Sequence, residues 1–233
     1  LLAVVLQTAT DDNVRASAAA ALGAIGGPAA EAALKQALAS SSDMLQLFAL
    51  DALRSIGASL SVELLLPRVD NAVTRRAATS LLGHSGNPEA LDLLVALLRD
   101  SMAGVRAAAA VALVTLDAAL ADLGKPDAVA AALAGSVDDT VRQRQRELVE
   151  HRQTEVKIAA LELCRMTKDA GALRHVLSAM SDPVVRERAA GFVTALGGEA
   201  DAALVALAPV VAPAALGDFF FLIPYQEPTR PSV

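Results

Sequence analysis

The sequence predicts an all-α solenoid in which about six to seven helix pairs stack side by side. Two observations lead to this prediction. Similar segments recur about every 30 residues, which is the signature of a repeat protein. The chain is also rich in alanine, and only 3% of its residues are aromatic. Because alanine favours helices and lets neighbouring backbones approach closely, we expect a core of tightly packed helices.

Each repeat is expected to contain two helices. Ala18, Leu22 and Ile25 follow the spacing of one helical face. Gly26-Gly27-Pro28 and Gly86-Asn87-Pro88 then stop a helix and start the next, which we expect over 29–38 and 89–98. The equivalent apolar positions, spaced by 31, 29 and 31 residues, are Leu22, Leu53, Leu82 and Leu113.

The segment 11–26 reads Asp-x-x-Val-Arg-x-x-Ala-Ala-x-Ala-Leu-Gly-x-Ile-Gly. This pattern resembles the HEAT-like repeats of the phycobilisome-lyase type, and the resemblance covers roughly residues 1–210. It implies a right-handed superhelix whose second helices line the concave side. That family includes scaffolds, adaptors, chaperones and a few enzymes, so the resemblance implies a fold more than an activity.

The repeat is interrupted between Leu113 and Cys164, which are 51 residues apart. We expect a solenoid over 1–216 that carries a charged helical insertion near 136–155. The insertion should project from the stack with a weak apolar face, and it is a candidate site for a protein partner. The alternative is a solvated helix held by Arg144–Glu147 and Arg146–Glu150 pairs. The candidate partner-binding residues are Arg142, Arg144, Arg146, Glu147, Glu150 and Arg152.

The tail, residues 217–233, is aromatic and contains prolines. It either folds back over the last helix pair, because a terminal repeat must cover its apolar end, or docks on another chain or a membrane. A membrane span over 202–224 would be interrupted by Pro209, Pro213 and Gly217. The candidate binding residues of the tail are Phe219, Phe220, Phe221 and Tyr225.

Charged residues recur at the start of the repeats. We interpret them as a structural ladder, in which each arginine pairs with the turn acid of its own or a neighbouring repeat. The alternative is a concave surface that binds phosphate or nucleic acid, which the net charge of −6 argues against. The ladder residues are Asp12, Arg15, Asp43, Arg75, Arg106, Asp182 and Arg186.

We predict no catalytic residue, metal site or cofactor. His84, His151 and His175 stand alone, without the neighbours that a metal site needs. Cys164 occupies an apolar repeat position, so a buried structural thiol is expected. The His-Glu pairs with which some HEAT-like enzymes bind iron do not occur.

These observations favour a non-catalytic scaffold or adaptor that binds a protein partner on its curved surface. No signal peptide precedes the first repeat, so we expect a cytoplasmic module that is part of a longer chain. One alternative is an accessory subunit or chaperone-like component of an enzyme such as a chromophore lyase. The other is a regulatory segment of a membrane transporter or signalling protein.

Overall fold

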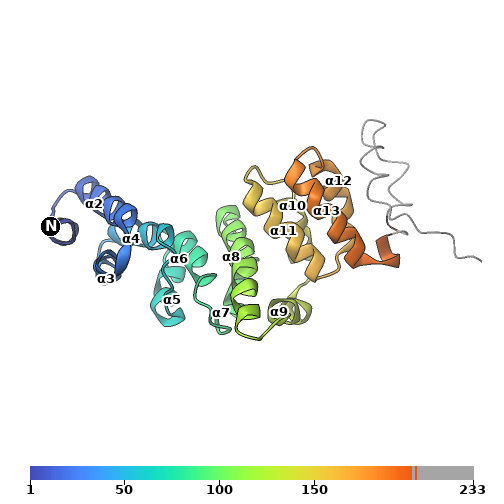
Figure 1. Cartoon of the computed structure of the whole chain (residues 1–233), viewed down its shortest axis with the longest axis horizontal. Helices are drawn as coiled ribbons and strands as arrows, with labels where there is room; N and C mark the ends of the chain where they lie inside the picture. Colours follow the sequence, from blue (N-terminus) through green and yellow to red (C-terminus); the bar gives the residue numbers. More distant parts are fainter. Residues whose placement is uncertain (201–202, 204–233) are drawn as a thin grey trace, which may run out of the picture. The chain divides into compact units, whose positions relative to one another are not determined.

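The computed structural model describes residues 1–200 and 203, and every regular element within them is a helix (Figure 1). The all-α solenoid predicted from the sequence is therefore confirmed. The chain divides into two compact units, unit 1 (Leu1–Ser136) and unit 2 (Val137–Val233).

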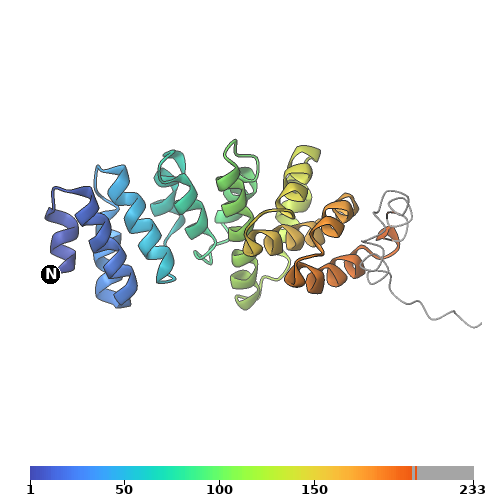
Figure 2. The ribbon, with the colours of Figure 1, turned by 90° about the horizontal axis from the view of Figure 1, so that it is seen from above.

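Unit 1 consists of two rows of helices, seen side by side in Figure 2. The first helices of the repeats are α2 (Asp12–Ile25), α4 (Asp43–Ser55), α6 (Arg75–Leu82) and α8 (Ala103–Asp122). The second helices are α1 (Leu2–Thr8), α3 (Gly27–Ala37), α5 (Val62–Asp70), α7 (Ala90–Leu97) and α9 (Ala128–Ser136). The predicted second helices at 29–38 and 89–98 correspond to α3 and α7, within two residues at each end.

The core of unit 1 follows the predicted repeat. Leu53, Leu82 and Leu113 are fully buried, and Leu22 is only 7% exposed. Their helices α2, α4, α6 and α8 contact one another in that order, so the four leucines belong to successive layers of one core. Burying a leucine contributes about 1.5–3 kcal/mol, which makes this row a major source of stability.

Small residues bring the first helices together. A Cβ atom added at Gly83, the C-cap of α6, would lie 2.7 Å from both the Cα and the carbonyl oxygen of Ala112 in α8. Neighbouring first helices pack directly on one another along the whole row, whereas α3, α5 and α7 contact each other less. Within unit 1, the first helices therefore form the more closely packed row.

Short polar side chains begin several of the helices. Asp11 accepts a hydrogen bond from the Asn13 backbone N–H and Ser42 accepts one from Leu45, at the starts of α2 and α4. Asp138 does the same for Val141 at the start of α10 (Asp139–Leu148). These caps satisfy donors that the first helical turn leaves without a partner.

Unit 2 contains α10 (Asp139–Leu148), α11 (Thr154–Met166), the 3₁₀ helix η1 (Ala170–Ala172), α12 (Leu173–Ala179) and α13 (Pro183–Leu196). Helices α11 and α13 pack together, with α12 against α13. Helix α10 lies against α11, with Val141, Leu148 and Val149 buried. The charged insertion is thus a packed helix and does not project from the stack, because its three apolar residues hold it there.

Helix α8 is the one helix among the described residues that is long and apolar enough to cross a membrane, judged by length and composition alone. It contacts α6, α7 and α9, and Val105, Leu113 and Leu116 are fully buried. The apolar residues of α8 are therefore part of the core of unit 1. The span considered over 202–224 and the tail 217–233 lie outside the described residues.

Candidate interaction surfaces

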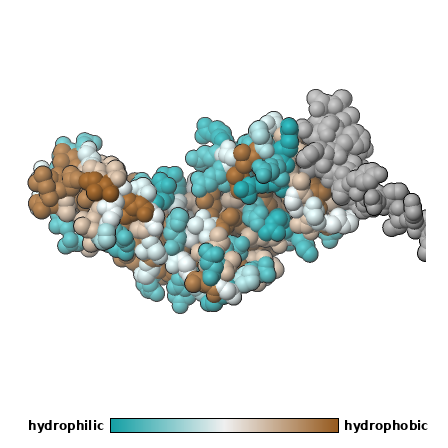
Figure 3. Space-filling view, in the orientation of Figure 1, coloured by the Kyte–Doolittle hydropathy of each residue, from teal (hydrophilic) through white to brown (hydrophobic). Residues whose placement is uncertain are grey.

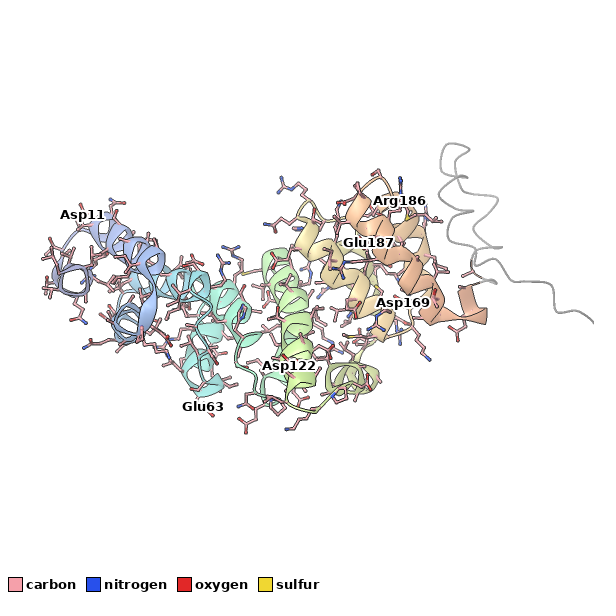
Figure 4. All side chains as sticks on the ribbon, in the orientation of Figure 1. Asp11, Glu63, Asp122, Asp169, Arg186 and Glu187 are labelled. Carbon is pink, nitrogen blue, oxygen red and sulfur yellow. The ribbon has the colours of Figure 1, made fainter. Side chains whose placement is uncertain are left out.

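Arg146, a predicted partner-binding residue, makes a structural ion pair. Its Nε and Nη2 atoms donate to the two carboxylate oxygens of Asp169, at 2.7 and 2.6 Å. Asp169 is labelled in Figure 4. Asp169 is buried, and this hydrogen-bonded partner raises the pKa of the Arg146 guanidinium. A bidentate pair of this kind fixes the side chain and leaves few donors for an outside ligand.

Glu150 also binds within unit 2. One of its carboxylate oxygens accepts a hydrogen bond from the Ser178 hydroxyl at 2.8 Å and lies 2.8 Å from Nδ1 of His175. These two contacts, that of Ser178 above all, lower the pKa of the Glu150 carboxyl. The expected Arg146–Glu150 pair is wrong, because Arg146 binds Asp169 and Glu150 binds α12.

The remaining charged residues of the insertion are exposed or half-buried. Glu147 and Arg152 are exposed, and Arg142 and Arg144 are half-buried. Glu147 accepts a hydrogen bond from the Gln143 amide at 3.3 Å. The predicted tail residues Phe219, Phe220, Phe221 and Tyr225 lie outside the described residues.

The arginines at the starts of the first helices point toward the ends of the preceding second helices. Arg75 Nε donates to the carbonyl oxygen of Val69 at 2.7 Å, and Arg106 Nη1 donates to that of Asp100 at 2.9 Å. The last carbonyl oxygens of a helix accept no hydrogen bond from within it, and they carry partial negative charge. The arginines therefore stabilise the turn between two repeats.

The same contact recurs in other repeats with different side chains. Arg15 donates to Gln7 at 3.5 Å, Gln46 donates to Ser40 at 2.6 Å, and Arg186, labelled in Figure 4, donates to Met180 at 3.2 Å. Gln46 thus substitutes for arginine where the sequence pattern breaks.

Acidic side chains complete several of these turns. Asp12 lies 3.6 Å from Arg15, Asp100 lies 3.2 Å from Arg75 of the neighbouring repeat, and Asp182 lies 3.3 Å from Lys157. Asp43 accepts a hydrogen bond from the Asn71 amide at 2.9 Å. The turn acids are therefore held by a mixture of ion pairs and neutral contacts.

Large apolar side chains are exposed at the start of each first helix of unit 1. We call Val14, Met44, Val73 and Met102 the edge stripe; they are 45%, 43%, 43% and 45% exposed. They follow one another at intervals of 30, 29 and 29 residues, one in each repeat. Because the first helices lie side by side, their starts form one edge of the unit (Figure 2).

Further apolar surface lies at the beginning of unit 1. Leu1, Val4 and Ile25 are 99%, 59% and 70% exposed. Figure 3 shows hydrophobic residues gathered over α1, α2 and α4 on one face of the molecule.

The part of the chain that the structure describes contains no group of three or more His, Cys, Asp or Glu placed to hold a metal ion. Cys164 is buried, and this burial raises the pKa of its thiol to about 12. Because only the thiolate is a strong nucleophile, Cys164 is an unreactive core residue at neutral pH.

A family model for HEAT repeats matches residues 1–79 and 68–150. No curated protein matches the chain. Among solved structures, one engineered protein is 18% identical with a TM-score of 0.55, over 93% of this chain and 65% of its own. A second engineered protein is 21% identical with a TM-score of 0.52, over 85% of this chain and 96% of its own. These two likenesses show the fold alone.

The complex of CpcE and CpcF of phycocyanin lyase from Nostoc sp. PCC7120 is 21% identical, over 96% of this chain and 94% of its own. Its TM-score of 0.32 is too low to bear on function. The family match confirms the resemblance seen in segment 11–26. Since the HEAT-repeat model covers more than half of the sequence, this chain belongs to the HEAT-repeat family.

Proposed function

We propose that this protein is a non-catalytic interaction module whose unit 1 binds a protein partner along the edge stripe. HEAT repeats generally mediate protein interactions. The observation that carries the proposal is the stripe itself, since it presents one large apolar side chain per repeat to solvent along a single edge. Apolar side chains gathered on a rigid surface are typical of interaction sites.

The packing of the repeats supports this proposal. The first helices are held against one another by buried leucines, and their starts are fixed by the arginine contacts described above. The stripe residues therefore keep their spacing before a partner arrives. A preorganised surface loses little conformational entropy on binding, so more of the contact energy contributes to affinity.

Two functions considered from the sequence stay predictions. These are an accessory subunit of a chromophore lyase and a regulatory segment of a transporter or signalling protein. The expected cytoplasmic location stays a prediction as well.

The test compares two variants of the full chain in cells that contain its natural partner. Met44→Glu combined with Val73→Glu places charge on the stripe, whereas Leu66→Glu changes an equally exposed residue, 43% exposed, on α5. We expect affinity capture of the partner to be lost with the first variant and retained with the second. Equal capture by both variants would refute the role of the edge stripe.

A further inference from the structure

We infer that the edge stripe binds an extended polypeptide segment that carries an apolar residue at every third position and basic residues between them. This inference rests on the proposed function, because it assigns a chemical class to the partner of the same surface. Its evidence is the spacing of the stripe and the charge beside it.

The spacing of the stripe is set by helix packing. Val14 is the third residue of α2, Met44 is the second residue of α4, and Met102 is the N-cap of α8. Val73 lies in the turn before α6. Since packed helices lie about 8–10 Å apart, successive stripe members are separated by roughly that distance along the edge.

A polyproline-II segment has the matching repeat. It has three residues per turn and rises about 3.1 Å per residue, so same-face side chains recur about every 9 Å. A β-strand repeats its faces about every 6.6 Å, which does not match the interval between repeats. An α-helix advances about 5.4 Å per turn, which is shorter than the interval between stripe members. One of its side chains would therefore face the polar surface between two stripe members.

Carboxylates accompany the stripe and indicate basic residues in the partner. Asp12 precedes Val14 by two residues, and Asp43 directly precedes Met44; both acids are exposed. Asp70, also exposed, precedes Val73 by three residues. Arg15 lies 3.6 Å from Asp12 and also donates to the Gln7 carbonyl oxygen. Asp43 receives a neutral donor from Asn71. The edge therefore combines apolar contacts with negative charge, which attracts lysine or arginine.

The test uses synthetic peptides and the full chain. The probe is the sequence Leu-Pro-Lys repeated four times, which presents one leucine per turn of a polyproline-II helix. The control peptide has the same composition, with its leucines adjacent in pairs so that the three-residue interval is lost. Binding is measured by fluorescence anisotropy of labelled peptide at low and at physiological salt.

We expect the regular peptide to bind and the irregular peptide to bind at least about tenfold more weakly, since the loss of even one apolar contact is of that order. Met44→Ser with Val73→Ser removes two apolar contacts without changing the charge of the edge, and it should weaken binding of the regular peptide to a similar extent. Leu66→Glu should leave it unchanged, and Asp43→Asn with Asp70→Asn should reduce its salt dependence. Circular dichroism of each variant checks that the helices are intact.

Three outcomes would overturn the inference. These are equal binding of the two peptides, equal effects of the stripe and Leu66 variants, and preferential binding of a helical apolar peptide that has the same charge. If the peptides fail while the stripe variant still loses its natural partner, the inference on partner class fails and the proposed function stands. If the stripe variant captures the partner normally, both fail.

Discussion

Replacing Gly83 by alanine should destabilise unit 1, because the added methyl group has no room between α6 and α8. The new Cβ would lie 2.7 Å from the Cα and the carbonyl oxygen of Ala112, and 3.1 Å from its carbonyl carbon. Carbon atoms in good contact are about 3.5–4.0 Å apart, so the two helices must separate by roughly 1 Å. The obstructing atoms belong to the backbone and cannot rotate away. Overpacking of this kind costs about 1–3 kcal/mol.

Two other glycines provide a graded comparison. At Gly23 an added Cβ would lie 2.9 Å from the Ser55 hydroxyl, which can rotate, and 3.1 Å from the Cβ of Ala52. The loss at Gly23 should therefore be smaller than at Gly83. At Gly191, inside α13, nothing lies within 4 Å of the added atom. Alanine there should stabilise the helix by about 0.5–1 kcal/mol, because glycine is a poor helix former.

Urea unfolding followed by circular dichroism measures this series. The chain contains no tryptophan, so the helix signal is a suitable probe. Hydrogen exchange of the α6 and α8 amides should locate the loss in Gly83→Ala. The reasoning would be refuted if Gly83→Ala were as stable as the parent protein or as Gly191→Ala, because the close approach of the first helices would then not limit the core.

The further predictions concern three sites of unit 2. Arg146→Ala should cost about 3–5 kcal/mol of unfolding free energy, because it leaves the buried Asp169 carboxylate without its charged partner. In calorimetry, adding Asp169→Ala should cost less than the sum of the single losses. Native Cys164, with a thiol pKa of about 12, should resist iodoacetamide until the protein unfolds, and thiol-labelling rates in urea check this. In the unfolded chain the thiol ionises at its ordinary pKa of 9.0, whereas in the folded protein its pKa is about 12. The free energy of unfolding should therefore also fall as the pH rises from about 9 toward 12. Ser178→Ala should raise the pKa of Glu150 toward its ordinary value in an NMR titration, because the mutation removes the largest contact that lowers it. Glu150 stabilises the fold above its ordinary pKa, and this contribution is lost as the pH falls. The variant should make that contribution smaller.

The repeat itself was predictable because its sequence signal is local. Leu22, Leu53, Leu82 and Leu113 are each flanked by apolar residues at helical spacing, and all four are buried. Each glycine-proline motif stops one helix and starts the next within a few residues, so the starts of α3 and α7 follow from the local sequence.

The contacts of Arg146 were not predictable in the same way. Sequence spacing favoured Glu150, one helical turn away, whereas the structure places Asp169 against the guanidinium from 23 residues further along the chain. Such a partner depends on how α10 lies against α11. No local pattern encodes that arrangement, although a buried acid after a helix end is a signal worth testing.

The edge stripe was missed because its members do not share one repeat position. Val14 aligns with Leu45 and Val105, which are buried, while Met44 and Met102 fall at other places in the motif. Aligning the repeats by their conserved leucines therefore hides the stripe. The intervals of 30, 29 and 29 residues between large apolar residues near the helix starts were visible in the sequence.

The fate of α10 shows why polar composition does not predict exposure. Gln145 and Arg146 occupy the positions where the repeat has two alanines, and Gln145 is buried without a hydrogen-bond partner for either amide atom among the described residues. An unsatisfied buried amide costs about 1–3 kcal/mol. Burial of Val141, Leu148 and Val149 contributes roughly 1.5–3 kcal/mol for each side chain, which exceeds that cost. Three apolar residues are thus enough to hold a charged helix against its neighbour, and the charges of Arg146 and Glu150 enter pairs within unit 2. In this protein the surface left to a partner is better identified from exposed apolar residues than from the densest run of charge.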